Sequence, residues 1–214
     1  MRKPLLLDLF AGAGGAGVGY ARAGFRVVGV DHIPQPSYPF PLAVADAVEF
    51  VARHGRDYDL IHASPPCQGY SRMARAVPTR APRMIEVVRE ALVGTGRPFV
   101  IENVEGAPLD CPLLLCGTMF GLSFRRHRLF EIHPPLLLLT SDCSCRLGVQ
   151  RGRLVGHRTS GRVGAGRIQP PDFTEDQRRT ALGAHWMTAR EARQAVPPAF
   201  TQFIGARLLR AGLP

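Results

Sequence analysis

The sequence of 214 residues has no apolar run long enough to cross a membrane, and the four leucines at 136–139 fall far short of one. Its five cysteines are an odd number, which is atypical of a disulfide framework and indicates a reducing compartment. The first residues, Met1-Arg2-Lys3, lead directly into an apolar segment, so a cleaved signal peptide is not expected. These absences predict a cytoplasmic protein with no membrane partner.

A glycine-rich turn follows the first apolar segment. Residues 4–10 read as a buried strand, residues 11–17 contain four glycines, and a helical pattern then ends at Gly24. This order is typical of the first unit of a nucleotide-binding α/β fold, in which bare backbone lets a ligand approach closely. No Gly-Lys-Ser/Thr follows the turn, as a phosphate-cradling P-loop would require. A second strand ends in Asp31, where an acid usually binds ribose hydroxyls, so a nucleoside ligand is favoured over a triphosphate.

A cysteine follows another buried strand through two prolines. The apolar residues 58–63 lead into Ser64-Pro65-Pro66-Cys67-Gln68-Gly69. Two successive prolines stop a strand and stiffen its exit, so Cys67 is held like a nucleophile. A half-buried structural cysteine is the alternative interpretation.

The remaining pattern alternates between strands and helices and predicts a single doubly wound α/β domain. Further strands are expected at 42–45, 60–63, 98–102, 113–116 and 128–132, and helices at 46–52, 83–93, from 188 and from 198. The last helix places Phe200, Ile204 and Leu208 on one face. Residues 68–82 form a loop long enough to act as a lid over Cys67.

Four motifs occur in an order that resembles the cytosine-C5 DNA methyltransferases. They are Asp8-Leu9-Phe10-Ala11-Gly12-Ala13-Gly14-Gly15, Ser64-Pro65-Pro66-Cys67-Gln68, Glu102-Asn103-Val104 and Arg126-His127-Arg128. The layout is similar to a short, phage-type member of that family. The resemblance implies a Rossmann-like class I methyltransferase domain that uses S-adenosylmethionine. It also implies DNA methylation linked to restriction-modification, in a bacterial or phage-infected cell.

The resemblance assigns the catalytic roles. Cys67 would attack C6 of cytosine and thereby make C5 able to accept a methyl group. Glu102 would hold N3 and the exocyclic amine and act as an acid, with a structural ion pair as the alternative. Arg128 would donate to O2, and Arg126 would brace Arg128 or the cysteine loop. The field of both arginines would favour the thiolate, whereas Asn103 would brace the turn.

It also assigns a cofactor pocket. Phe10 would stack on adenine, Asp31 would bind the ribose, and Asp46 would lie near the adenine amino group. Phe10 and Asp46 have the alternative roles of core residue and helix cap. The other expected cofactor contacts are Gly12, Gly14, Pro66 and Gln194, the last within a C-terminal element similar to the final family motif.

A basic arm lies between Cys143 and Pro171, where six arginines and six glycines occur without an acidic residue. With a net charge of +10, it is suited to DNA phosphates, although a solubility role is the alternative. We expect double-stranded DNA as the partner, contacted by Gln68, Ser71, Arg72, Arg151, Arg153 and Arg158. The arm is too short for a full recognition domain, so sequence specificity is expected to be weak or to come from a partner protein.

The predicted organisation is a catalytic domain at 1–135, the basic arm at 136–173 and C-terminal helices at 174–214 that pack back on the catalytic domain. We expect a monomer. Cys143-Ser144-Cys145 with His157 lacks a full ligand set, so no metal is expected. Two other functions remain open, namely the same covalent chemistry on RNA or with a modified cofactor, and a non-catalytic DNA-binding or anti-restriction protein.

Overall fold

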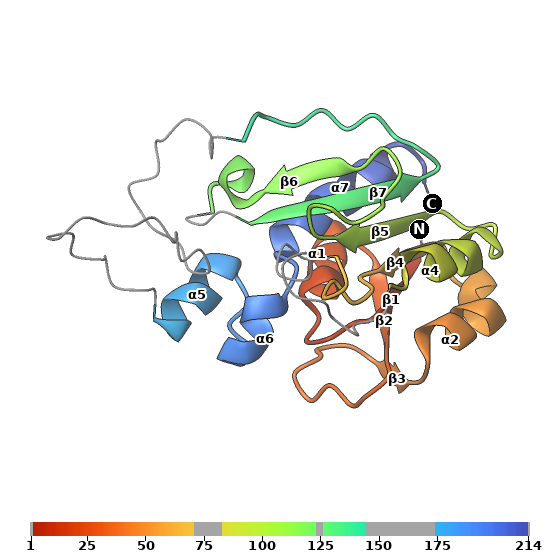
Figure 1. Ribbon diagram of the computed structural model, residues 1–214, viewed down its shortest axis with the longest axis horizontal. Coiled ribbons are helices and arrows are strands. Elements are labelled where there is room, and N and C mark those ends of the chain that lie inside the picture. Colours follow the sequence, from red (N-terminus) through yellow and green to blue (C-terminus); the bar gives the residue numbers. More distant parts are fainter. Residues whose placement is uncertain (1, 71–82, 123–125, 144–173, 214) are drawn as a thin grey trace, which may run out of the picture.

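The computed structural model describes residues 2–70, 83–122, 126–143 and 174–213. Its centre is a seven-stranded sheet in the order β3-β2-β1-β4-β5-β7-β6 (Figure 1). The strands are β1 (Leu5–Leu9), β2 (Arg26–Asp31), β3 (Leu42–Val44), β4 (Leu60–Ala63), β5 (Phe99–Asn103), β6 (Leu113–Cys116) and β7 (His127–His133). Neighbours among β1 to β5 pair in parallel, whereas β7 is antiparallel to both β5 and β6.

Helices cover both faces of the sheet. They are α1 (Gly15–Ala23), α2 (Ala47–His54), α4 (Ile85–Val93), α5 (Glu175–Leu182), α6 (Ala189–Gln194) and α7 (Pro198–Arg210), with 3₁₀ turns η1 (Gly55–Asp57) and η2 (Gly117–Phe120). Side chains alternate along each strand, so Leu6 packs with α1 and α7 while Leu7 packs with α2 and α4. The expected doubly wound α/β fold is confirmed.

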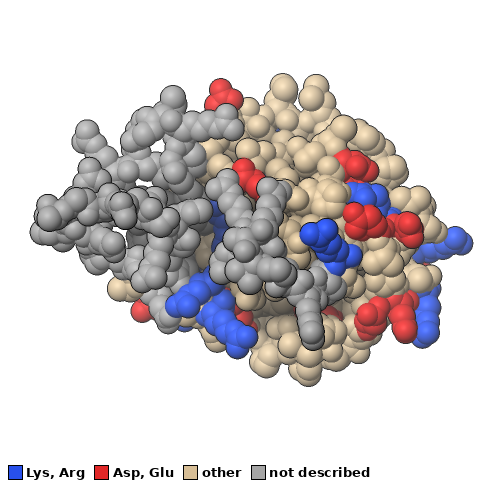
Figure 2. All heavy atoms as spheres, in the orientation of Figure 1, with Lys and Arg blue, Asp and Glu red and all other residues tan. Residues whose placement is uncertain are grey.

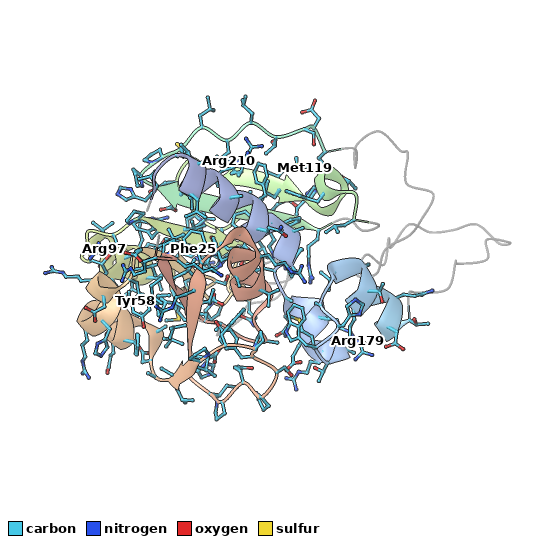
Figure 3. The ribbon with its side chains drawn as sticks, turned by 180° about the vertical axis from the view of Figure 1, so that it is seen from behind. Phe25, Tyr58, Arg97, Met119, Arg179 and Arg210 are labelled. Carbon is cyan, nitrogen blue, oxygen red and sulfur yellow. The ribbon has the colours of Figure 1, made fainter. Side chains whose placement is uncertain are left out.

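Helices α1 and α7, which are far apart in the sequence, pack tightly together. A Cβ atom on Gly19 would overlap Thr201 Oγ1 and the carbonyl of Pro198, so only glycine permits this approach. The Thr201 hydroxyl also donates to Ala16 O at 2.8 Å. Figure 3 shows α7 lying beside α1 on one side of the sheet, with Phe25 next to α1. Residues 185 positions apart therefore share one core.

Most predicted elements are found, with small differences at their ends. The third strand ends at Val44 rather than at residue 45, because Asp46 caps α2 by accepting from the backbone N–H groups of Val48 and Glu49. The strand pair at 113–116 and 128–132 is confirmed, and β7 extends it by one residue at each end. The predicted capping box of Thr188 and Glu191 begins α6.

One helix was not predicted. α5 begins at a second capping box, in which Thr174 Oγ1 accepts from Gln177 N and Gln177 Oε1 accepts from Thr174 N. The Thr-x-x-Gln spacing was the available signal. Residues 71–82 of the predicted lid lie outside the described residues, as do residues 144–173 of the basic arm. The division into 1–135, 136–173 and 174–214 stays a prediction.

Within the described ranges, no helix combines the length and apolar character that crossing a bilayer requires. On the face seen in Figure 2, the described acidic and basic side chains are interspersed and do not form a patch of one sign. A strongly positive DNA-binding surface is therefore not provided by that part of the described molecule.

Candidate active site

The cysteine turn lies at the carboxyl end of β4, where ligands of doubly wound sheets usually bind. Asn103, at the end of neighbouring β5, donates from Nδ2 to the carbonyl of Pro65 at 2.9 Å. The backbone N–H of Tyr70 donates to Cys67 O at 3.0 Å. The turn is therefore braced on both sides of the cysteine, and the predicted bracing role of Asn103 is confirmed.

Glu102 and Arg128 form a buried ion pair beside this turn. They come from the adjacent antiparallel strands β5 and β7, and Arg128 Nε lies 2.8 Å from Glu102 Oε1. Their side chains are only 7% and 15% exposed. Among the described residues, Arg128 is thus the group that balances the charge on this buried oxygen.

Burial has a strong effect on the acid. It raises the pKa of the Glu102 carboxyl above its usual range, although Arg128, a hydrogen bond from Ser64 and the charge of Arg126 oppose it. The carboxyl therefore holds its proton closer to neutral pH than an exposed glutamate does. Such a group is suited to donating a proton.

The charges of both Glu102 and Arg128 affect the pKa of Cys67. Burial raises the pKa of the Cys67 thiol, and it outweighs the lowering by Arg128 and Arg126, while Glu102 raises the pKa further. Both arginines favour the thiolate, as expected, but desolvation by burial is the larger effect in the free protein. Cys67 therefore rests as a thiol.

A buried chain of hydrogen bonds leads to Glu102. Tyr20 Oη lies 3.2 Å from His62 Nδ1, and His62 Nε2 lies 2.9 Å from Ser64 Oγ. Ser64 donates its single hydroxyl proton to Glu102, so it must accept from His62 Nε2–H, and His62 Nδ1 then accepts from Tyr20. Burial lowers the pKa of His62 to about 3, which keeps the ring neutral.

This series of hydrogen bonds was not predicted from the sequence, because His62 lies within an apolar strand. The alternation of side chains along a strand could have indicated it. His62 and Ser64 are two residues apart, so their side chains point to the same face. Arg126 donates to the backbone carbonyls of Ala192 and Arg193, and so joins the end of α6 to the start of β7. Its expected bracing of Arg128 or the cysteine loop stays a prediction.

The glycine turn forms the neighbouring half of the site. Phe10, Gly12 and Gly14 all have positive φ, at 58°, 48° and 83°. Gly12 donates its backbone N–H to Asp31 Oδ2 at 2.9 Å, which joins the turn to the end of β2. A Cβ atom on Gly12 would meet nothing within 4 Å, so the bare backbone faces open space. This arrangement fits a ligand that lies against the backbone and reaches the Asp31 carboxylate.

The C-terminal region reaches the same turn. Trp186 Nε1 donates to Ala13 O at 2.8 Å, and the carbonyl of Val196 packs where a Cβ atom on Gly15 would be. Gln194 is exposed at the end of α6, two residues before Val196. The structure therefore places the predicted C-terminal element beside the turn.

The remaining predicted residues differ in position. Pro66 is half-buried and Gln68 is exposed, both next to Cys67. Asp46 is exposed, and its Oδ1 caps α2, which confirms the cap interpretation for that oxygen. Ser71, Arg72, Arg151, Arg153 and Arg158 lie outside the described residues.

Known proteins share part of this sequence and its fold. No family model matches the chain. It is 33% identical over 124 residues to the Type II methyltransferase M.XorII of Xanthomonas oryzae pv. oryzae, across 50% of this chain and 29% of that protein. It is 31% identical over 123 residues to the Type II methyltransferase M.AquIA of Picosynechococcus sp., across 47% of this chain and 48% of that protein.

The chain spans less than half the length of these relatives. Among solved structures, the Entamoeba histolytica methyltransferase EhMeth superposes with a TM-score of 0.61, over 99% of both chains at 11% identity. The chain thus has the fold of a Rossmann-like methyltransferase and is related, over about half of its length, to Type II methyltransferases.

Proposed function

We propose that this chain is an S-adenosylmethionine-dependent DNA (cytosine-5-)-methyltransferase. The observation that carries the proposal is the convergence of Cys67 with the buried Glu102–Arg128 pair, both of whose charges act on the thiol. A thiol, a proton-holding carboxyl and a fixed guanidinium are the three groups that covalent attack on cytosine needs. The names of the Type II relatives support DNA as the substrate class.

The cofactor half has residues suited to a nucleoside. S-adenosylmethionine, when bound, supplies an electrophilic methyl group. Asp31 would accept from the ribose hydroxyls, Gly12 and Gly14 would allow close approach, and Phe10 would lie against adenine. Pro66, Asp46 and Gln194 would complete the pocket. The open space beside Gly12 supports this assignment.

The covalent step assigns a role to each catalytic group. Cys67 would lose its proton to water, and its sulfur would form a bond to C6 of cytosine, while the electrons of the C5–C6 double bond move through the ring toward N3. Glu102 would donate its proton to N3 and so neutralise the developing charge. C5 would then be nucleophilic and would accept the methyl group that S-adenosylmethionine supplies when bound, which leaves S-adenosylhomocysteine. Water would take the C5 proton as the sulfur–C6 bond breaks, the N3 proton would return to Glu102, and the released Cys67 would regain a proton from water.

Arg128 has two roles in this scheme. Its guanidinium donates to O2 of the base, and its charge stabilises the thiolate once substrate binding changes the surroundings of Cys67. Arg126 acts by holding the end of α6 to β7, next to the pocket. Gln68, Ser71, Arg72 and the arm residues Arg151, Arg153 and Arg158 are proposed to contact DNA.

The proposal is tested by incubating the protein with isotopically labelled S-adenosylmethionine and either duplex DNA or RNA of matched sequence. Nucleoside mass spectrometry should find labelled 5-methylcytosine in DNA. Duplexes containing 5-fluorocytosine should trap wild-type protein covalently, because fluorine cannot leave as the C5 proton does. Cys67→Ala should lose both signals, whereas Cys111→Ala, a matched change at an exposed cysteine, should keep them. Methylation at an exocyclic amine, or on RNA alone, would contradict the proposal.

A further inference from the structure

A second cluster of reactive side chains lies at the edge of the sheet, outside the active site. It consists of Cys116 at the end of β6, His127 at the start of β7, and Cys143 in the segment after β7. One ligand atom from each residue lies within 4.8 Å of the other two. Cys116 is buried, and the other two residues are partly buried.

The fold explains how these distant residues meet. Cys116 and His127 are directly paired across the antiparallel ladder, so their side chains point to the same face. After β7, the chain runs back along this edge of the sheet past β6, as Figure 1 shows, and so brings Cys143 to the same end. Cys143 Sγ lies 3.4 Å from His127 Nε2. Met119, in the turn η2 that begins directly after Cys116, is labelled in Figure 3.

Hydrogen bonds orient the three side chains toward one another. Glu105 Oε1 lies 3.3 Å from His127 Nδ1, which favours the tautomer with its proton on Nδ1 and the Nε2 lone pair toward the two sulfurs. Cys116 Sγ accepts from the backbone N–H of Met119 and from the Thr118 hydroxyl at 3.3 Å. The Thr118 hydroxyl also lies 3.8 Å from Cys143 Sγ. Donors of this kind stabilise negative charge on sulfur.

We propose that Cys116, His127 and Cys143 bind a zinc ion. Two sulfurs and one imidazole nitrogen suit Zn²⁺, whereas Mg²⁺ and Ca²⁺ require oxygen ligands. Tetrahedral zinc with bonds of about 2.0–2.3 Å sets its ligand atoms roughly 3.5–3.8 Å apart. The observed cluster needs only a small contraction to reach this geometry. Two thiolates and a neutral imidazole also balance the charge of the ion.

The sequence did not indicate this site, because the cysteines that lie nearest to each other along the chain are Cys143 and Cys145, and His157 is the histidine that follows them. Cys145 and His157 lie outside the described residues and are not part of the proposed set. Two of the proposed ligands, Cys116 and His127, become neighbours only through strand pairing. His127 lies directly between Arg126 and Arg128, so zinc would fix the start of β7, which carries Arg128 and directly follows Arg126. The proposal does not depend on the proposed methyl transfer.

The test measures metal directly. The protein is produced in zinc-supplemented medium, purified under reducing conditions without a metal-affinity step, and analysed by inductively coupled plasma mass spectrometry. One zinc ion per chain is expected. The zinc content of the double variant Cys116→Ser/Cys143→Ser should be at least tenfold lower. The matched double variant Cys67→Ser/Cys111→Ser, which removes the same number of thiols elsewhere, should retain it.

A second measurement covers the case in which the ligand variants do not fold. X-ray absorption at the zinc edge of the wild-type protein should show at least two sulfur ligands near 2.3 Å and one nitrogen near 2.0–2.1 Å. A wild-type protein purified without zinc would overturn the proposal. Equal zinc loss in both double variants, or thiol mapping that finds a Cys116–Cys143 disulfide, would also overturn it.

Discussion

Glu102 Oε1 and Arg128 Nε lie 2.8 Å apart on two adjacent strands, and both side chains are almost fully withdrawn from water. Removing one member of such a pair leaves an uncompensated charge, which typically costs about 3–5 kcal/mol. The pair also acts on Cys67 in opposite senses, because Arg128 lowers the pKa of the thiol and Glu102 raises it. The reactivity of the cysteine therefore reports on both partners.

The first prediction concerns this reactivity. Glu102→Gln should move the pH dependence of Cys67 alkylation to lower pH, since a charge that raises the pKa is removed. Arg128→Met should move it to higher pH. Iodoacetamide labelling followed by peptide mass spectrometry measures the rate at each pH, and exposed Cys111 in the same molecule is the internal control. Shifts of the same sign in both variants would contradict the described electrostatics.

The second prediction concerns the buried chain that ends at Glu102. Ser64→Ala removes a hydrogen bond that lowers the pKa of Glu102, so that pKa should rise further. The limb of the pH–rate profile that reports this carboxyl should move to higher pH. Ser64→Thr keeps the hydroxyl and should restore the wild-type profile. A slower rate with an unmoved profile would indicate that Ser64 is only a packing residue.

The third prediction concerns the cofactor. Hydrogen bonds to a charged carboxylate are worth about 1.5–3 kcal/mol each, so Asp31→Ala should weaken S-adenosylmethionine at least tenfold. Isothermal titration calorimetry gives the affinity. Asp57→Ala, which removes an exposed acid in η1, at the opposite end of β4, should have little effect. Unchanged affinity for Asp31→Ala would remove this residue from the pocket.

The fourth prediction concerns the basic arm. Neutralising Arg151, Arg153 and Arg158 together should weaken binding to all DNA sequences alike, because phosphate contacts carry no sequence information. The slope of log affinity against log salt should become shallower by up to about three. The methylation context, mapped by bisulfite sequencing, should not change. A changed context would show that the arm reads bases.

The fifth prediction concerns stability and pH. Asp8 is fully buried, and burial raises its pKa from 3.8 to about 7 despite a hydrogen bond from Tyr38. The folded state therefore binds this proton more tightly than the unfolded state. The contribution of Asp8 to the free energy of unfolding is fully present below pH 3.8 and is lost as the pH rises through about 7.

The neutral variant Asp8→Asn removes this dependence. Between pH 5 and pH 8 the wild-type protein should lose about 3 kcal/mol of unfolding free energy relative to the variant. Urea unfolding of both proteins at the two pH values measures the difference. His62 contributes with the opposite sign, since its pKa falls to about 3, but it is common to both proteins and cancels. Equal dependence on pH in the two proteins would contradict a protonated Asp8.

The sequence predicted most of the sheet because its buried strands are short apolar runs that end at Asp31, shortly before Cys67, and next to Glu102. Parallel strands bring such ends to one edge, so the sequence alone was enough to place these residues together. The net effect on the Cys67 thiol could not be predicted, because it depends on a balance of burial against charge. The cluster of Cys116, His127 and Cys143 could not be predicted either, because it requires the register of β6 and β7.

The contacts of the glycine turn bear on the order in which this protein acquires its structure during synthesis. The turn is translated before its partners, because Ala13 bonds Trp186, Gly15 packs on Val196, and Gly19 packs on Thr201. A ribosome must therefore translate at least 173 further residues before those contacts form. Until then, one face of the nascent sheet lacks its covering helix α7, which leaves apolar surface accessible to chaperones. The site at the glycine turn is thus completed late, although the turn itself is translated long before the segments that pack on it.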